Sequence, residues 1–366
     1  MANILITGGA GFIGANFVMY WRRSRPHDRI VVLDALTYAG NHSNLDSFAA
    51  DAAFQFVHGD ICDATLVKSL FEQHRFERVV HFAAESHVDR SIVSSEAFIR
   101  TNVQGTHTLL DAALAAWRGG IGDLRFHHIS TDEVFGSLGP SDAPFTEASP
   151  YDPKSPYAAS KAASDFLVRA YAHTYGLPVL ITNCSNNYGP FQFPEKLIPL
   201  VILNSLTGKS LPIYGDGKNV RDWLHVDDHC AALAVVLEKG RLGETYNIGG
   251  GHEAANIDLV GMLCDVIDKR FVGDDGLVAR FPDCPAALGG KCRELMTFVK
   301  DRPGHDQRYA ICADKLSAEL GCRAQTPFTE GVAKTIDWYL ANEHWWRPIQ
   351  SGVYRDWVAL QYGESP

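Results

Sequence analysis

The amino-acid sequence predicts an α/β protein in which a doubly wound parallel sheet is joined to a second, smaller α/β domain. Short runs of β-branched residues alternate with amphipathic segments over the first half of the chain. A glycine-rich turn follows the first run, and Pro, Gly and aromatic residues become denser after about residue 189. Alternation of strands and helices implies parallel strands joined by right-handed crossovers, which gives the doubly wound sheet.

Six short apolar runs are expected to form buried strands, because they are rich in β-branched and aromatic residues. They are Asn3–Thr7, Ile30–Asp34, Phe54–Val57, Arg78–Phe82, Leu124–Ser130 and Pro178–Asn183. Amphipathic segments such as Ala64–His74 and Ile99–Trp117 lie between the strands and are predicted helices. Helix-like Asp227–Lys239 and strand-like Thr245–Ile248 are expected to return to the same sheet.

The length of 366 residues suits one large domain with a smaller partner. We expect residues 1–189, with roughly 220–250 returning to the sheet, to form the first domain. Residues 190–219 and 251–366 are expected to form the second. The stretch 273–292 has the character of an insertion, and the sequence assigns no role to it.

Composition argues against several classes of protein. The formal net charge is −10, whereas binding to nucleic acid or to an anionic membrane requires a basic surface. No window holds the roughly 20 apolar residues that span a bilayer, and the N-terminal run lacks the basic segment of a signal peptide. The eight cysteines form no C-x-x-C pair, so we expect reduced thiols in a cytoplasmic protein, and no metal site.

The segment TGGAGFIG, Thr7–Gly14, places Gly8, Gly11 and Gly14 between a strand and a helical segment. In this context the first glycine permits a tight turn, and the second lets the backbone approach a pyrophosphate. The third lets helix and strand pack closely, so that the helix N-terminus faces the phosphates of a dinucleotide. The alternative is a plain glycine turn that binds no ligand.

Asp34 ends the second predicted strand, twenty residues after Gly14. A carboxylate at this position accepts hydrogen bonds from ribose hydroxyls and repels a 2′-phosphate, which favours NAD over NADP. Asp60 and Ile61, after the third strand, are expected at the adenine edge, and Ala83–Ser86, after the fourth, beside the nicotinamide. The alternative is that Asp34 merely begins a loop.

Tyr157 and Lys161 are four residues apart in SPYAASKAASDF, so a helix places them on one face. Ser155 suits the N-cap of that helix and Pro156 its first position. A phenol has a reference pKa of about 10, and we expect Lys161, the cationic nicotinamide and the helix N-terminus to lower the pKa of Tyr157. After a dinucleotide turn the pair predicts oxidation of an alcohol, although surface helices also carry this spacing by chance.

These residues, together with several longer motifs, resemble the extended short-chain dehydrogenase/reductase family of NAD-dependent epimerases and dehydratases. The motifs cover nearly the whole chain: TGGAGFIG, AAESHVDRS, STDEVFG, YAASKA, NCSNNYGP, PEKLIPL, LPIYGDGKNVRDWLHVDDH and DRPGHDQRYAI. Of these, STDEVFG is typical of the dehydratases, because the epimerases of the family carry no acid–base pair there. The resemblance implies that the first domain is an NAD-binding Rossmann domain and that the second binds a nucleotide sugar.

The resemblance further implies a reaction on dTDP-glucose, as in deoxysugar biosynthesis. The sugar is oxidised at C4, water is lost between C5 and C6, and hydride returns to C6. The C4 ketone acidifies the C5 hydrogen, and two carboxylates that differ in protonation then remove water. Asp132 is expected to be the acid, its pKa raised by Glu133, and Glu133 the base. Thr131 is expected to hydrogen-bond O4 beside Tyr157.

The two carboxylates impose a geometric condition. Consecutive side chains of a strand point to opposite faces, so Asp132 and Glu133 can share one site only if the chain turns sharply at the strand end. A solvated loop with a helix cap is the alternative for this segment.

The resemblance also assigns binding residues. Expected contacts of NAD are Gly8, Gly11, Phe12, Ile13, Gly14, Asp34, Ala35, Leu36, Thr37, Asp60, Ile61, Phe82, Ala83, Ala84, Ser86, Thr101, Tyr157, Lys161 and Asn187. Expected contacts of the nucleotide sugar are Ser86, Thr131, Asp132, Glu133, Asn186, Lys196, Leu197, Pro212, Ile213, Tyr214, Arg221, Asn256, Asp301, Arg302 and His305. Among the latter, Arg221, Arg302 and His305 are the predicted anion clamps. The helices around Ile99–Trp117 and Ala158–Tyr175 are expected to form a homodimer interface.

The sequence departs from the family pattern at one position, and it leaves three alternative functions. Phe135 stands where relatives often have tyrosine. A nucleotide-sugar 4-epimerase would use Thr131, Tyr157 and Lys161 without the carboxylate pair, and a dehydratase could instead take UDP- or CDP-glucose. The third alternative is a sensor that binds NAD without catalysis.

Overall fold

The computed structural model describes residues 2–120, 122–301 and 304–350. The chain divides into two compact units, and each is described by itself. The first unit comprises Met1–Asn187, Asp222–His252 and Asp306–Gln325. The second comprises Tyr188–Arg221, Glu253–His305 and Thr326–Pro366.

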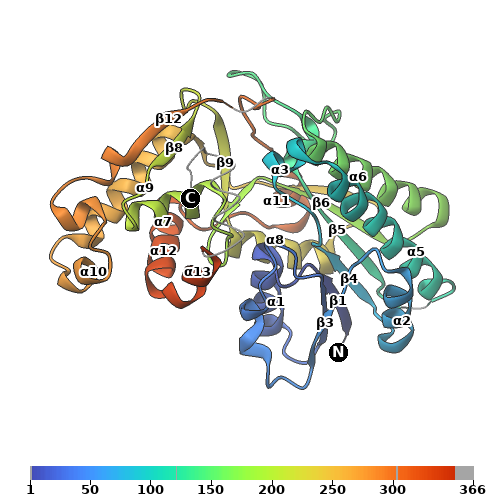
Figure 1. Ribbon diagram of the computed structural model, residues 1–366. Helices are drawn as coiled ribbons and strands as arrows, with labels where there is room; N and C mark the ends of the chain where they lie inside the picture. Colours follow the sequence, from blue (N-terminus) through green and yellow to red (C-terminus); the bar gives the residue numbers. More distant parts are fainter. Residues whose placement is uncertain (1, 121, 302–303, 351–366) are drawn as a thin grey trace. The chain divides into compact units, whose positions relative to one another are not determined.

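The first unit is built on a seven-stranded parallel sheet with the strand order β10-β6-β5-β4-β1-β2-β3 (Figure 1). The strands are β1 Asn3–Thr7, β2 Arg29–Asp34, β3 Phe54–His58, β4 Arg78–His81, β5 Arg125–Thr131, β6 Val179–Cys184 and β10 Thr245–Ile248. The predicted doubly wound sheet is confirmed. Because β1 lies between β2 and β4, the strand order reverses there, which is where open α/β sheets bind ligands at their carboxyl ends.

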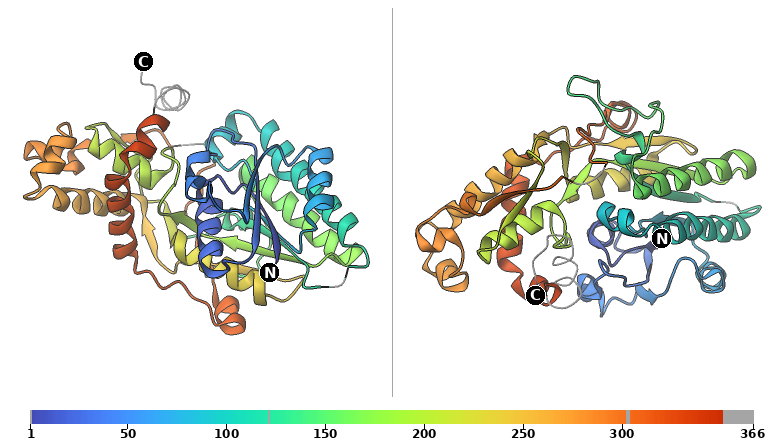
Figure 2. Two further views of the ribbon diagram at one scale, coloured as in Figure 1. Left: turned by 90° about the horizontal axis from the view of Figure 1, so that it is seen from below. Right: turned by 45° about the horizontal axis from the view of Figure 1, so that its top comes forward.

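Helices cover both faces of this sheet, as the views in Figure 2 show. One face carries α1 Phe12–Ser24, α8 Val226–Lys239 and α11 Asp314–Leu320. The other carries α2 Ala64–His74, α5 Thr106–Trp117 and α6 Pro156–Tyr175. The strands alternate accordingly, since Ile4 and Ile6 of β1 belong to the first core and Leu5 to the second.

Residues 306–325 belong to the first unit, whereas the sequence placed them with the second. The reason is that Leu316 of α11 is buried in the core beneath α1 and α8. Polar contacts support this packing: Lys315 Nζ donates to the carbonyl of Thr245 over 2.8 Å, and Arg241 pairs with Glu319 over 2.8 Å. Both contacts join positions far apart in sequence, which local patterns do not reveal.

Further short elements of the first unit are η1 His42–Phe48, α3 Val88–Val93, α4 Glu96–Phe98, η2 Ile99–Gly105 and η3 Asp132–Phe135. The predicted single helix over Ile99–Trp117 is therefore a π-helical turn, η2, that continues into α5.

The second unit contains a two-stranded parallel sheet, β8 Leu211–Tyr214 and β12 Met296–Val299. Its helices are α7 Leu197–Leu206, α9 Asn256–Phe271, α10 Asp275–Arg280, η4 Pro285–Leu288, η5 Cys292–Leu295, α12 Phe328–Ala341 and α13 Glu343–Ile349. A three-stranded sheet of β7 Asn186–Tyr188, β9 Val220–His225 and β11 Glu253–Ala255 has the order β11-β9-β7.

All eight cysteines are free thiols, including Cys284 and Cys292 of the predicted insertion, whose Sγ atoms lie 3.7 Å apart. Within residues 2–120, 122–301 and 304–350 the structure holds no cluster of three or more His, Cys, Asp or Glu side chains arranged for a metal. The described helices include none that combines the length and the apolar character of a membrane span.

Candidate active site

The glycine turn lies between β1 and α1, and two of its glycines are required by close packing. Gly8 has a φ of +71°, and an added Cβ there would lie 2.6 Å from the backbone nitrogen of Ala83. A Cβ at Gly14 would lie 2.2 Å from the carbonyl oxygen of Gly8. At Gly11, the N-cap of α1, the nearest atom to an added Cβ is the same oxygen at 3.3 Å, a much looser approach. Packing within the chain therefore requires glycine at Gly8 and Gly14 more strictly than at Gly11, the position predicted to face a pyrophosphate.

Asp34 ends β2 and connects it to the glycine turn. Its Oδ2 accepts a hydrogen bond from the amide of Ala10 at 2.9 Å, and its Oδ1 accepts one from the amide of Leu36 at 2.8 Å. Burial raises the pKa of the Asp34 carboxyl, and the two amides oppose that shift. Asp34 therefore fixes its own loop, and each oxygen retains a lone pair that can accept a ribose hydroxyl.

The other predicted cofactor contacts follow the carboxyl ends of neighbouring strands. After β3, Asp60 pairs with Arg100 over 2.6 Å, and Ile61 is buried. After β4, the amide of Ala83 donates to Thr7 Oγ1 over 3.3 Å. After β6, Asn187 Oδ1 lies 2.8 Å from Nδ1 of His229. The remaining predicted contacts in the first unit lie at the start of α1, after β2, after β4 or in η2: Phe12, Ile13, Ala35, Leu36, Thr37, Phe82, Ala84, Ser86 and Thr101.

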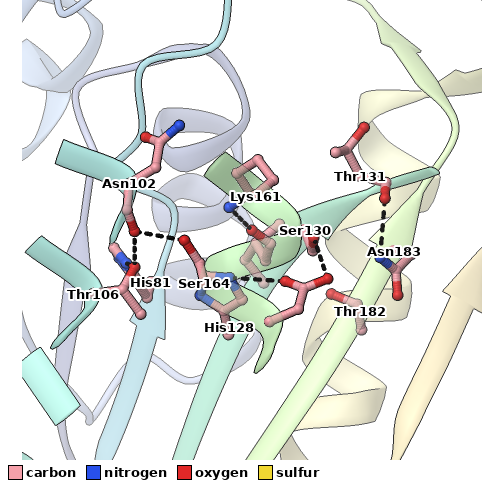
Figure 3. A network of polar contacts seen from close by, with 12 residues as sticks. His81, Asn102, Thr106, His128, Ser130, Thr131, Lys161, Ser164, Thr182 and Asn183 are labelled. Carbon is pink, nitrogen blue, oxygen red and sulfur yellow. Dashed lines mark hydrogen bonds and ion pairs between the residues drawn. The ribbon is translucent and has the colours of Figure 1, made fainter. Parts of the chain in front are cut away.

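Tyr157 and Lys161 occupy the first two turns of α6. Ser155 caps the helix by accepting the amide of Ala158 at 3.1 Å, and Pro156 occupies its first turn, as the sequence predicted. Both functional side chains are buried, with 8% of Tyr157 and 4% of Lys161 exposed. Lys161 Nζ donates to the carbonyl of Ile129 in β5 over 2.8 Å, so the ammonium is held against the sheet (Figure 3).

The expected direction of the Tyr157 pKa is wrong for the polypeptide itself. Burial raises this pKa well above its ordinary value, the negative charges of Glu133 and Asp132 raise it further, and a hydrogen bond with Thr131 lowers it. The sequence predicted that Lys161, the cationic nicotinamide and the helix N-terminus together would lower this pKa. Within the polypeptide, burial and the two carboxylates raise it instead and keep the phenol protonated.

The segment Asp132–Phe135 forms the sharp turn that two adjacent carboxylates require. Strand β5 ends at Thr131, and the 3-10 helix η3 begins at the next residue. Thr131 Oγ1 accepts the amide of Glu133 at 3.3 Å and donates to Asp132 Oδ1 at 3.3 Å. The turn ends at Gly136, where φ is +87° and a Cβ would meet the carbonyl of Asp152 at 2.6 Å.

The turn brings both carboxylates towards one phenol. Asp132 is 2% exposed and Glu133 is half-buried, yet the charges of both act on Tyr157. The geometric condition set by the sequence is thereby met, since an extended backbone would have sent one of the two side chains to the opposite face of the sheet.

Phe135 is 3% exposed and packs in an aromatic cluster. Its ring stacks on Phe145 with a centroid distance of 5.2 Å and meets Tyr151 edge-on at 5.2 Å. The side chain therefore anchors the end of η3 by apolar contact with Phe145 and Tyr151.

Predicted substrate contacts that fall in the second unit are spread over several elements. Lys196 and Leu197 begin α7, Pro212, Ile213 and Tyr214 lie in β8, Arg221 lies in β9, and Asn256 begins α9. Arg302 lies outside the described residues.

Three of these residues are brought together in the second unit. His305 Nδ1 lies 2.6 Å from Asp301 Oδ1, and its ring is 6.1 Å from that of Tyr214. Arg221 is 5% exposed and donates to the carbonyl of Val220. Asn186, by contrast, belongs to the first unit, at the start of β7.

A buried polar cluster behind Lys161 was missed at the level of sequence. Asp165 lies one turn after Lys161 on α6 and contacts His128, Ser130 and Tyr151. The signal was available, because Lys161 and Asp165 have the i, i+4 spacing of an ion pair on a helix.

Comparison with known proteins places this site in context. Residues 5–335 match the family model described as GDP-mannose 4,6 dehydratase. The dTDP-glucose 4,6-dehydratase of Xanthomonas campestris pv. campestris is 54% identical over 361 residues, covering 97% of this chain and 98% of that protein. The enzyme of the same name from Shigella flexneri is 50% identical over 372 residues, covering 98% of each.

Solved structures are similar over nearly the same extent. The crystal structure of DesIV, a dTDP-glucose 4,6-dehydratase from Streptomyces venezuelae with NAD and dTDP bound, is 49% identical and has a TM-score of 0.84. The alignment covers 95% of this chain and 99% of DesIV. A UDP-glucose 4-epimerase from Thermotoga maritima with UDP-glucose has a TM-score of 0.79 at 26% identity, covering 93% of this chain and 99% of that one.

Proposed function

The chain belongs to the GDP-mannose 4,6-dehydratase family of extended short-chain dehydrogenases/reductases, and we propose that it converts dTDP-glucose to dTDP-4-keto-6-deoxyglucose and water. It is an NAD-dependent enzyme, a hydro-lyase of nucleotide-sugar metabolism that leads to deoxysugars. The observation that carries the proposal is the sequence identity of 50% and 54%, over nearly the full length of the chain, to enzymes named for that one activity. The paired carboxylates of η3 supply the chemistry that separates this activity from epimerisation.

The residues of the first unit fit NAD. Gly11 leaves room at the N-terminus of α1, which favours the pyrophosphate, and Asp34 ends the neighbouring strand where a ribose would be held. When bound, NAD supplies an acceptor for two electrons at C4 of the sugar and returns them at C6. Most of the contacts proposed from sequence follow the carboxyl ends of β1, β2, β3, β4 and β6, on both sides of the point between β1 and β4 where the strand order reverses.

We assign the oxidation step to Tyr157, Lys161 and Thr131. Tyr157 takes the proton of the C4 hydroxyl, and Thr131, which hydrogen-bonds the phenol, orients O4 beside it. Because the polypeptide holds the phenol protonated, ionisation of Tyr157 depends on positive charge, and Lys161 is the buried cation of the same helix face.

We assign the elimination step to the carboxylates of η3. The ketone at C4 acidifies the C5 hydrogen, so Glu133 can remove it as a general base. Asp132, almost fully buried beside Glu133, protonates the departing C6 hydroxyl. The two residues thereby divide proton removal and proton donation between them.

The second unit is proposed to bind the nucleotide, with Arg221, Arg302 and His305 as the anion clamps. A guanidinium matches phosphate oxygens with two parallel hydrogen bonds, which suits the diphosphate. Tyr214 lies beside His305 and offers a ring to the base or sugar.

A homodimer through η2, α5 and α6 remains a proposal. Ile99 of η2 and Phe166 and Tyr175 of α6 are 53%, 56% and 56% exposed. Exposed large apolar side chains on neighbouring elements are typical of an association surface. A cytoplasmic location likewise remains a prediction from the free thiols.

The function is tested by incubating the purified protein with NAD and dTDP-, UDP-, CDP- and GDP-hexoses in turn. The expected result is loss of one water from dTDP-glucose and a 4-keto-6-deoxy product, identified by mass spectrometry and NMR. A product of unchanged mass with the C4 configuration inverted would establish the epimerase instead. Turnover of a different nucleotide sugar alone would transfer the assignment to that substrate, and no turnover despite bound NAD would favour the sensor.

Asp34→Asn is expected to relax the preference for NAD over NADP by about 10-fold or more, because the charge that repels a 2′-phosphate is removed while one oxygen remains to accept one of the two loop amides. Dissociation constants of both dinucleotides, measured by calorimetry, test this. Asp28→Asn is the matched control, since Asp28 is equally buried and also accepts an amide, that of Ala2. If the ratio of the NAD and NADP dissociation constants were the same in the wild type and in Asp34→Asn, Asp34 would not be the residue that binds the ribose.

Asp132→Asn is expected to lower kcat about 100-fold with little change in KM, because the amide cannot donate an acidic proton to the leaving hydroxyl. Exchange of the C5 hydrogen with solvent should continue. Asp152→Asn, at the exposed carboxylate that pairs with Lys154, should retain normal turnover. Wild-type rates of water loss in Asp132→Asn would show that another group is the acid.

A further inference from the structure

A carboxylate without solvent access lies directly behind the proposed oxidation site. Asp165 of α6 is 0% exposed, and an isolated charge at such a depth is strongly destabilising. Its retention therefore requires partners, and the structure supplies them from three segments of the first unit: β5, the loop before α6, and α6 itself.

Two hydroxyl groups donate to one oxygen of this carboxylate. Ser130 of β5 donates to Asp165 Oδ2 at 2.9 Å, and Tyr151 donates to the same atom at 2.8 Å. Tyr151 in turn accepts a hydrogen bond from Arg169 at 2.8 Å. Because Ser130 immediately precedes Thr131 and Tyr151 packs against Phe135, both ends of the catalytic turn are tied to Asp165.

The other oxygen faces a histidine that is neutral. His128 Nε2 lies 3.2 Å from Asp165 Oδ1, and both side chains are fully buried. Burial lowers the pKa of His128 to about 4, in spite of the neighbouring carboxylate. Burial would raise the pKa of Asp165, but the contact with His128, the positive charge of Lys161 and the hydrogen bond from Tyr151 reverse the shift, so that its pKa lies below the ordinary value. At neutral pH the carboxylate is charged and the imidazole is not.

The charge of Asp165 acts on Lys161 and not on Tyr157. Tyr157, Lys161 and Asp165 are successive positions of one i, i+4 series on α6, so Lys161 lies between the other two along the helix. Asp165 raises the pKa of Lys161, whereas the charges that raise the pKa of Tyr157 include those of Glu133 and Asp132 but not that of Asp165.

Every strand beside Lys161 presents a titratable group to it. These groups are His81 on β4, His128 on β5 and Cys184 on β6, with Tyr157 and Asp165 on its own helix. Burial lowers the pKa of Lys161, whereas Asp165 and Cys184 act to raise it. Burial also raises the pKa of the Cys184 thiol, to about 12, so this group is uncharged near neutrality and Asp165 is the anion that remains.

We propose that Asp165 is a positioning residue for the oxidation step: its buried carboxylate keeps Lys161 charged and holds the end of β5 and Tyr151 in place around the catalytic turn. The inference rests on the proposed role of Lys161 in assisting Tyr157. Asp165 itself touches neither substrate nor cofactor in this role.

The first test compares the pH dependence of kcat for the wild type and Asp165→Asn. Without the carboxylate charge Lys161 loses its proton at lower pH, so the alkaline limb of the profile should move down by about one unit or more. At neutral pH kcat should fall about 100-fold with KM changed little, as expected for lost positioning. Ser130→Ala and Tyr151→Phe keep the negative charge of Asp165. Each should lower kcat by less than about 10-fold and leave the alkaline limb of the pH profile in place.

The second test requires neither substrate nor cofactor. Acetic anhydride reacts with the unprotonated amine, so labelling at a series of pH values, with the Lys161 peptide quantified by mass spectrometry and each curve normalised to its own plateau at high pH, reports the protonation of this buried lysine separately from its access. Labelling of Lys161 should begin at lower pH in Asp165→Asn than in the wild type. Asp28→Asn, at another buried carboxylate of the first unit, should match the wild type.

The outcomes separate the inference from the proposed function. Failure of the wild type to dehydrate any nucleotide sugar would overturn the function, whereas the labelling series still decides the charge of Lys161. Unchanged labelling and an unchanged alkaline limb in folded Asp165→Asn would overturn the inference. If Asp165→Asn does not fold, Asp165→Ser, which also removes the negative charge, replaces it. The same shift of the labelling curve to lower pH is expected there, and no shift would again overturn the inference.

Discussion

Replacement of Glu133 by glutamine is expected to abolish dehydration, by about 1000-fold or more, while the sugar is still oxidised at C4. The amide has the shape of the carboxylate but cannot accept the C5 proton, and the oxidation step uses Tyr157 on a different element. Exchange of the C5 hydrogen in deuterated water, followed by mass spectrometry, should disappear. Quenching with borodeuteride should still introduce deuterium at C4, because the ketone forms and is trapped.

The control for this variant is Glu147→Gln. Glu147 is another half-buried carboxylate of the first unit, and it accepts the amide of Asn247 at 2.8 Å without contacting the catalytic turn. This variant should retain exchange and product formation. If Glu133→Gln exchanged C5 at the wild-type rate, Glu133 would not be the base, and the reason for two adjacent carboxylates would have to be sought elsewhere.

Removing the phenol oxygen with Tyr157→Phe should stop the reaction before the ketone forms, with a loss of about 1000-fold or more in kcat. The phenol is the group placed to take the hydroxyl proton, and without oxidation the C5 hydrogen is not acidic. Neither C5 exchange nor trapped ketone should then be detected. This pattern differs from that of Glu133→Gln, in which the ketone persists.

Tyr171→Phe is a matched control for the second variant. Tyr171 lies on the same helix, is 8% exposed like Tyr157, and also has a pKa raised by burial, but its hydroxyl donates to Asp111. Loss of that hydroxyl should affect stability more than turnover. Trapped ketone at the wild-type level in Tyr157→Phe would assign the oxidation step to another base.

Local patterns in the sequence determined the strands of the central sheet and the glycine turn. Buried parallel strands are continuous apolar runs, and Gly14 is required by a contact with Gly8 within the same turn. The cap of α6 by Ser155 and Pro156 was predictable for the same reason, since helix ends are satisfied by the residues that flank them. The close approach of Ala83 to Gly8, by contrast, joins positions far apart in the sequence.

The sequence by itself thus determined the sheet, its carboxyl edge and the residue types brought to that edge, because these follow from periodicity and from neighbours a few positions away. The tertiary structure alone decided three further properties: the return of residues 306–325 to the first unit, the raised pKa of Tyr157, and the enclosure of Asp165 by Ser130, Tyr151 and His128. Desolvation and charge are sums over side chains that meet only after folding, so the spacing of Tyr157 and Lys161 could predict their shared face but not the protonation of the phenol.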